Sequence, residues 1–128
     1  MKIQVSGLIS PELNKQVKFW AREIGKDLNI KSKIFITISL YGADNGQINI
    51  LGPEKYQIWL NKALNARNTL ETLAHELKHV NQFESGNLVA KNGNLYFKGE
   101  NMAEIPYMRR PFEIEARKYG KFALIKYQ

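Results

Sequence analysis

The sequence predicts a single α+β domain covering residues 1–128. Apolar residues recur at helical spacing in some segments and alternate at strand spacing in others. Neither a linker rich in Pro, Gly or Ser nor an internal repeat divides the chain. A domain of this length can bury a real core, and a composition with 44% apolar and 24% charged residues is typical of globular proteins.

The first predicted elements are a short strand at residues 1–7 and a helix that follows it. Ser10 is a good N-cap and Pro11 is favoured at the first helical position, so the helix should begin here and end near Leu28. Four apolar residues at helical spacing give this helix a buried face: Leu13, Val17, Trp20 and Ile24.

Three strands are predicted before the next helix. Residues 34–41 alternate between two faces, and residues 47–51 are expected to pair with them across a turn at residues 43–46. Gly and Pro at residues 52–53 end that hairpin, and residues 56–60 form the third strand.

The second helix is expected to begin at Asn68, a good N-cap that Glu71 can reach from three residues further on. Its apolar stripe consists of Leu70, Leu73, Leu77 and Val80, and Gly86 is a suitable stop signal. Asn-Gly at residues 92–93 then predicts a hairpin between residues 88–91 and 95–98. A last helix should start at Pro111 and run close to the end of the chain.

Composition limits the possible functions. No apolar run approaches the roughly 20 residues that a membrane span needs, and residues 1–10 do not resemble a signal peptide, so a cytoplasmic protein without membrane association is expected. The net charge of +7 permits contact with nucleic acid or acidic partners, but no nucleic-acid-binding motif is present. The oligomeric state is left open.

Two histidines, His75 and His79, are the only ones in the chain, and there is no cysteine. A transition-metal site must therefore use His nitrogen and carboxylate oxygen. Four residues of α-helix advance about 400°, so both imidazoles lie on one side of the helix and can bind one Zn²⁺. The expected cofactor is Zn²⁺.

Glu76 points about 100° away from His75 around the helix, so it cannot easily share the metal position. It can instead reach a water on the metal. Zinc peptidases need this arrangement, because the metal acidifies the water and polarises the scissile carbonyl while a carboxylate transfers the proton. Glu76 is therefore the expected general base and later the general acid.

A catalytic zinc site needs a third protein ligand and an open fourth position. The candidates are Glu84, Glu100, Glu104, Glu113 and Glu115. Glu84 follows His79 on the same helix and should point away from the metal, whereas Glu100 and Glu104 fall in a predicted loop. Glu113 and Glu115 lie in the first turns of the last helix, which can hold a ligand rigidly against the second helix.

The run His75-Glu76-Leu77-Lys78-His79 followed, after 33 residues, by Glu113-Ile114-Glu115-Ala116 resembles the gluzincin metallopeptidases. Residues 72–82 also resemble SprT-like and phage-encoded zincins, and the chain length is similar to that of the minigluzincins. The resemblance implies a zincin-like domain, in which a small mixed sheet with an edge strand packs on the N-terminal helix and the active-site helix. It also implies that Glu113 is the third ligand, with Ala116 allowing close helix contact, while Glu115 remains the second choice.

One position departs from the pattern of this family. Many gluzincins have Asp or Asn four residues after the ligand Glu, where it orients a zinc-binding His, but this chain has Arg117. Partners of this kind change metal affinity or activity by about 10–100-fold. Either another residue orients the histidine or the site is weaker.

Substrate contacts are also implied by the resemblance. In zincins an edge strand above the metal pairs with extended substrate, and residues 56–60, with Ile58, Trp59 and Leu60, are expected to do so here. Tyr107 and Tyr119 are candidate hydrogen-bond donors to the oxyanion.

The predicted function is a zinc-dependent endopeptidase that acts on a peptide or protein substrate. The alternative is a non-catalytic or latent module of the same fold that binds a protein or nucleic acid. A third possibility joins the two: a basic peptidase that acts on proteins bound to nucleic acid. The loop at residues 99–110 is long enough to cover the cleft as an inhibitory plug.

Overall fold

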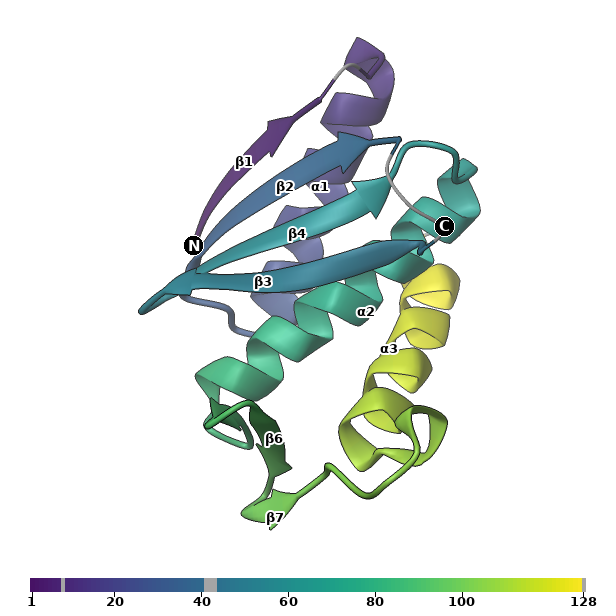
Figure 1. Ribbon diagram of the computed structural model, residues 1–128. Coiled ribbons are helices and arrows are strands. Elements are labelled where there is room, and N and C mark those ends of the chain that lie inside the picture. Colours follow the sequence, from purple (N-terminus) through teal and green to yellow (C-terminus); the bar gives the residue numbers. More distant parts are fainter. Residues whose placement is uncertain (8, 41–43, 128) are drawn as a thin grey trace.

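The structure is a computed structural model that describes residues 1–7, 9–40 and 44–127 (Figure 1). The main sheet has the strand order β1-β2-β4-β3, with β1 (Lys2–Ser6), β2 (Lys33–Ser39), β3 (Gly46–Gly52) and β4 (Lys55–Asn61). β1, β2 and β4 are mutually parallel neighbours, whereas β3 pairs antiparallel with β4 at the sheet edge. The predicted α+β class and the mixed sheet are confirmed.

Helices α1 (Pro11–Asp27) and α2 (Ala66–Glu84) cover one face of this sheet, and α3 (Pro111–Tyr127) lies beside α2 (Figure 1). The main core fills the space between sheet and helices, where alternate residues of β2, namely Ile34, Ile36 and Ile38, are buried against the apolar stripes of α1 and α2. Gly120 lets α3 approach α2 closely, because a Cβ there would lie 3.0 Å from the backbone oxygen of Glu71.

A second, smaller sheet consists of β5 (Leu88–Lys91), β6 (Asn94–Phe97) and β7 (Glu100–Asn101), and a 3-10 turn, η1 (Tyr107–Arg109), leads into α3. Asn92 and Gly93 both have positive φ, as the predicted Asn-Gly hairpin requires. A small separate core of Leu88, Phe97, Met102 and Phe112 joins this sheet to the first turn of α3.

The first helix and the last helix begin where the sequence predicts, since the side chain of Ser10 accepts from the backbone N–H of Leu13 and α3 starts at Pro111. The predicted start of α2 is wrong. Asn65, not Asn68, is the N-cap, and its side chain accepts a 2.8 Å hydrogen bond from the backbone N–H of Asn68. Asn65 and Asn68 are both suitable N-caps three residues apart, and the helix begins after the earlier one.

The predicted pairing of residues 34–41 with 47–51 is also wrong. β3 pairs with β4 instead, across a tight turn in which Glu54 has positive φ, and β4 lies between β2 and β3. The nearly continuous buried run of β4, from Tyr56 to Leu60 apart from Gln57, is typical of an internal strand. Part of the predicted turn at residues 43–46, and the end of the strand at Tyr41, lie outside the described residues.

No helix within the described residues has the length and apolar character that crossing a membrane requires.

Candidate metal centre

Helix α2 places the two histidines on its side away from the sheet. The opposite stripe of the helix, Leu70, Leu73, Leu77 and Val80, is fully buried in the main core, and this packing fixes the rotation of the helix. His75 and His79 lie one turn apart, with their rings edge-on at 79° and their Nε2 atoms 3.2 Å apart. Both Nε2 atoms therefore point to the same place.

Glu113 reaches this place from the first turn of α3. Its Oε1 lies 3.1 Å from Nε2 of His75 and 3.0 Å from Nε2 of His79. The side chain is buried, and the small core around Phe112 holds the turn that carries it. The packing of α3 on α2 thus brings Glu113 next to His79, which lies 34 positions earlier in the sequence.

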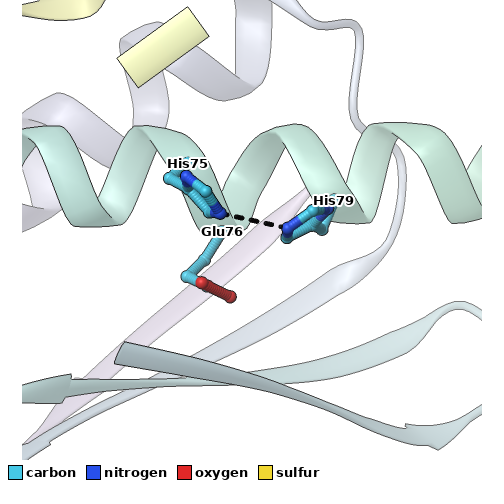
Figure 2. A group of neighbouring side chains, drawn as sticks. All are labelled: His75, Glu76 and His79. Atoms are coloured by element: carbon cyan, nitrogen blue, oxygen red, sulfur yellow. Dashed lines mark hydrogen bonds between the residues drawn. The ribbon is translucent and has the colours of Figure 1, made fainter. Parts of the chain in front are cut away.

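These three atoms satisfy a simple test for a metal site. Donor atoms around a tetrahedral zinc, each roughly 2.0–2.1 Å from the ion, are separated from one another by about 3.3 Å. The three observed separations are 3.2 Å, 3.1 Å and 3.0 Å. His75, Glu76 and His79 also form a group whose potential ligand atoms lie within 4.8 Å of one another and could hold a metal ion (Figure 2).

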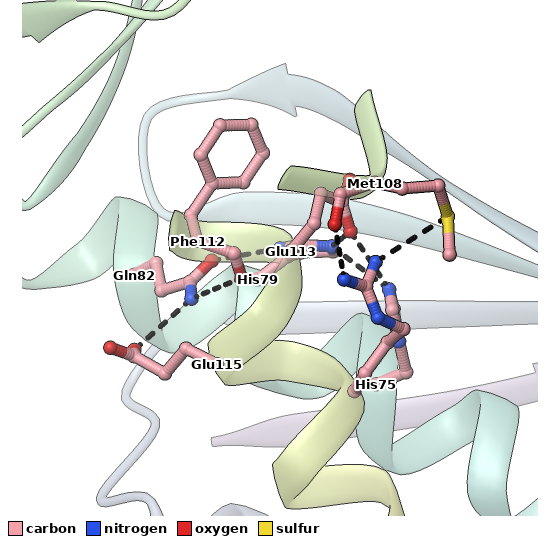
Figure 3. Close-up of polar contacts among 8 residues, drawn as sticks. His75, His79, Gln82, Met108, Phe112, Glu113 and Glu115 are labelled. Carbon is pink, nitrogen blue, oxygen red and sulfur yellow. Dashed lines mark hydrogen bonds and ion pairs between the residues drawn. The ribbon is translucent and has the colours of Figure 1, made fainter. Parts of the chain in front are cut away.

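Gln82 fixes which nitrogen of His79 is available. Its amide nitrogen donates to the backbone oxygen of Phe112 at 3.0 Å and to Glu115 at 3.1 Å, so its amide oxygen faces Nδ1 of His79 at 2.8 Å (Figure 3). An oxygen accepts only from a protonated nitrogen, so Nδ1 carries the proton. In neutral His79 the lone pair of Nε2 is then directed at Glu113, so this nitrogen is available either to a proton that it shares with the carboxylate or to a metal ion.

This arrangement accounts for the departure at Arg117. The contact that orients His79 comes from Gln82, three residues along the same helix, and not from the residue four positions after Glu113. Arg117 instead donates to the backbone oxygen of Met108 at 2.6 Å and connects η1 to α3. Sequence reasoning missed Gln82: its place one turn beyond His79 is a local signal, but the contacts with Phe112 and Glu115 that orient its amide are distant in sequence.

Electrostatics separates the roles of the two buried carboxylates. Burial alone would raise the pKa of Glu113, but hydrogen bonds from His75 and His79 hold it well below its usual range. Burial raises the pKa of Glu76, and the nearby histidines only partly oppose this effect. For His79, burial alone would lower the pKa, but the hydrogen bond and the charge of Glu113 raise it above its ordinary value.

A cleft of about 750 Å³ opens beside the centre. One wall is α2, which contributes His75 and Glu76. Gly46, the first residue of the edge strand β3, forms the second wall, and residues of α3 and η1 form the third. Glu76 thus lies where the metal centre meets open space, and its side chain leaves α2 on the sheet side in Figure 2. From the predicted loop at residues 99–110, Tyr107 lines the cleft.

The two candidate tyrosines have different surroundings. Burial and the neighbouring Glu113 carboxylate raise the pKa of Tyr107 to about 12, so its hydroxyl is protonated at neutral pH beside the centre. The hydroxyl of Tyr119 donates to Asp27 at 2.7 Å, so it is engaged outside the group formed by His75, His79 and Glu113.

Other predicted site residues lie elsewhere. Glu115 bonds Gln82 and lies 3.7 Å from the ammonium of Lys78, so it supports the centre from outside. Glu84 accepts from the backbone N–H groups of Lys31 and Ser32 and from the hydroxyl of Ser32. Glu100 and Glu104 are exposed.

The proposed role of residues 56–60 in pairing with substrate is wrong for this fold. β4 is hydrogen-bonded on both sides, to β2 and β3, so its backbone has no free edge. Ile58 and Leu60 are buried in the main core, and the indole N–H of Trp59 donates to Ser39 on the other face of the sheet. The edge strand next to β4 is β3, and β1 forms the other edge of the sheet.

Comparison with known proteins gives no relative: no protein-family model matches the chain, and no significant match exists among curated proteins or solved structures.

Proposed function

We propose that this protein is a zinc-dependent endopeptidase of the gluzincin type, with His75, His79 and Glu113 as the metal ligands. The observation that carries this proposal is the triangle of two imidazole nitrogens and one carboxylate oxygen, with sides of 3.0–3.2 Å, next to a cleft that Glu76 lines. Two nitrogens and one oxygen are a donor set found in catalytic zinc sites.

When bound, zinc would supply Lewis acidity toward the scissile carbonyl and an attacking water. Glu76 takes the proton of that water and later delivers it to the leaving amine nitrogen. A carboxylate suits this work when its pKa is raised toward the working pH, as the burial of Glu76 favours. Tyr107 lines the cleft and is protonated at neutral pH, so it can donate to the oxyanion once its hydroxyl is released from Glu113.

The edge strand β3 is the place for an extended substrate. It pairs with β4 along one side only, and Asn45 and Gly46 at its beginning line the cleft. A peptide that adds to a free strand edge is held by main-chain hydrogen bonds, which are independent of its side chains. This favours an endopeptidase with broad sequence tolerance.

The experiment measures metal and proteolysis on the same preparations. Wild-type protein, stripped with chelator and reloaded separately with Zn²⁺, Co²⁺ or Mn²⁺, is assayed for bound metal and for cleavage of a quenched fluorescent unfolded protein. We expect one zinc per chain and zinc-dependent cleavage, both lost in His75→Ala. Equal zinc in wild type and His75→Ala would remove the proposed site, and stoichiometric zinc without cleavage would leave a structural site only.

A further inference from the structure

The face of the main sheet that points away from the helices is basic. Lys2, Lys33 and Lys55 are directly paired across β1, β2 and β4, and all three are exposed. Neighbouring strands are about 4.8 Å apart, so the three ammonium groups form a short row. None of the four strands, all of which lie within the described residues, contains Asp or Glu, and Glu54 in the β3–β4 turn is the acidic residue next to the row.

Beside this row lies a groove of about 300 Å³ that crosses the sheet. Gln4, Phe35 and Gln57 occupy consecutive positions across β1, β2 and β4, and all three line the groove together with Lys55. The aromatic ring of Phe35 is half-buried, and the ammonium of Lys55 lies 5.6 Å from its centroid. A flat ring is thus presented next to a cation.

Amide and hydroxyl groups surround the ring. The amide of Gln57 donates to Thr37 and accepts from Asn49, so three adjacent strands are joined by side-chain hydrogen bonds on this face. Such bonds fix the side chains in place, and the remaining amide lone pairs and N–H groups can contact a polar ligand. The face therefore combines one aromatic platform, a cationic row and amides with both donors and acceptors.

We propose that this face binds single-stranded nucleic acid. A base stacks on Phe35, the groove amides contact its polar edge, and Lys2, Lys33 and Lys55 lie along the phosphates. The side chain of Lys55 is exposed, so its ammonium can move to a phosphate while the base takes its place over the ring. Stacking platforms and cationic tracks of this kind tolerate many sequences.

Charge and shape favour this ligand over other anions. A duplex keeps its bases stacked inside, so it cannot reach a ring on a flat sheet. An anionic membrane or an acidic peptide would use the lysines but would gain nothing from Phe35 beyond simple apolar contact. The face is separate from the metal centre, which lies on the helical side, so the inference stands independently of the proposed function.

The test is fluorescence anisotropy with labelled dT15 and rU15 oligonucleotides from 25 to 200 mM NaCl, in the presence of chelator. We expect binding that weakens with salt, with a slope of about −2 in log K against log salt for three phosphate contacts. The two oligonucleotides distinguish DNA from RNA. A 15-base-pair duplex and polyglutamate serve as competitors, and both should displace the oligonucleotide poorly.

Two variants separate stacking from charge. Phe35→Leu keeps an apolar side chain in the sheet, and we expect about tenfold weaker binding with an unchanged salt slope. The triple change Lys2→Gln, Lys33→Gln, Lys55→Gln should weaken binding at least tenfold and flatten the salt slope.

The matched control carries the same loss of charge elsewhere, as Lys15→Gln, Lys62→Gln and Lys91→Gln, all exposed and outside this face. Thermal unfolding of each variant shows that it is folded. The proposal is overturned if the control triple weakens binding as much as the face triple, if Phe35→Leu binds as wild type, or if polyglutamate or duplex competes as well as dT15.

Discussion

The two helices that form the walls of the candidate metal centre, α3 and α2, shift the pKa of a buried carboxylate in opposite directions. On the α3 wall, Glu113 contacts two imidazoles, and these contacts keep its pKa low and its charge stable. On the α2 wall, Glu76 is buried beside the cleft, and burial raises its pKa. Two carboxylates whose surroundings push their pKa values apart are suited to different work, one to hold a cation and the other to move a proton.

The largest expected effect comes from removing the charge of Glu76. Glu76→Gln keeps the shape of the side chain but removes its ability to accept a proton, so we expect peptidase activity to fall by about 10²–10⁴-fold with zinc still bound. Activity on the quenched substrate and zinc content are measured together. The same change should stabilise the metal-free protein at pH 7, because a buried carboxylate no longer has to be ionised.

The control for that variant is Glu71→Gln, on the same helix and lining the same cleft. Glu71 forms an ion pair with Lys121 at 2.6 Å, and this pair is partly exposed. We expect activity within a few-fold of wild type. If both variants lost activity equally, the assigned role of Glu76 would be wrong.

The second-largest expected effect is on zinc affinity, in variants of the α3 carboxylates. Glu113→Ala removes one of the three proposed metal ligands, and we expect zinc affinity to fall by more than 100-fold, beyond the range that outer partners reach. Glu115→Ala, two residues away, should lower it by about tenfold or less, since it acts through Gln82. Competition with a chromogenic chelator measures both. A larger loss in Glu115→Ala would reverse the assignment of the third ligand.

A smaller effect is expected from Gln82, which links the two walls. Gln82→Met has similar length but cannot accept the Nδ1 proton of His79 or bond Phe112 and Glu115. We expect zinc affinity to fall by about 10–100-fold, with the protein still folded. Unchanged affinity in the same chelator competition would mean that packing alone orients His79.

Short-range patterns made most helices and the second hairpin predictable. Ser10-Pro11, Asn92-Gly93 and Pro111 each act through a local backbone preference, so no knowledge of distant contacts was needed. The His75–His79 spacing is equally local, because the geometry of one helical turn fixes it.

Long-range pairing was the part that the sequence did not determine. Residues 47–51 could pair with either of two strands, β2 or β4. The choice of β4 depends on which strand lies inside the sheet and is buried on both faces, and this is a property of the whole sheet. The wrong pairing led directly to the wrong edge strand. Gln82 was missed for a similar reason, since its partners Phe112 and Glu115 are about 30 residues away.

The smallest effect concerns pH and the metal-free protein. The raised pKa of His79 contributes stability that is complete below its unfolded value of about 6.5 and is lost as pH rises through the higher folded value. The raised pKa of Glu76 acts in the same direction, because ionising this buried group costs stability as pH rises. The lowered pKa of Glu113 acts oppositely, and its contribution is lost only as pH falls below about 4.3.

Chelator-treated protein should therefore be more stable at pH 6 than at pH 8, because both raised pKa values favour the folded state at the lower pH. Urea unfolding at the two pH values measures the difference, and Glu113→Gln should reduce it because the partner charge of His79 is gone. Zinc-loaded protein should show the reverse trend, since metal competes with protons for Nε2 of His79. Metal-free protein that is more stable at pH 8 would mean that the charge on Glu113 does not hold a proton on His79.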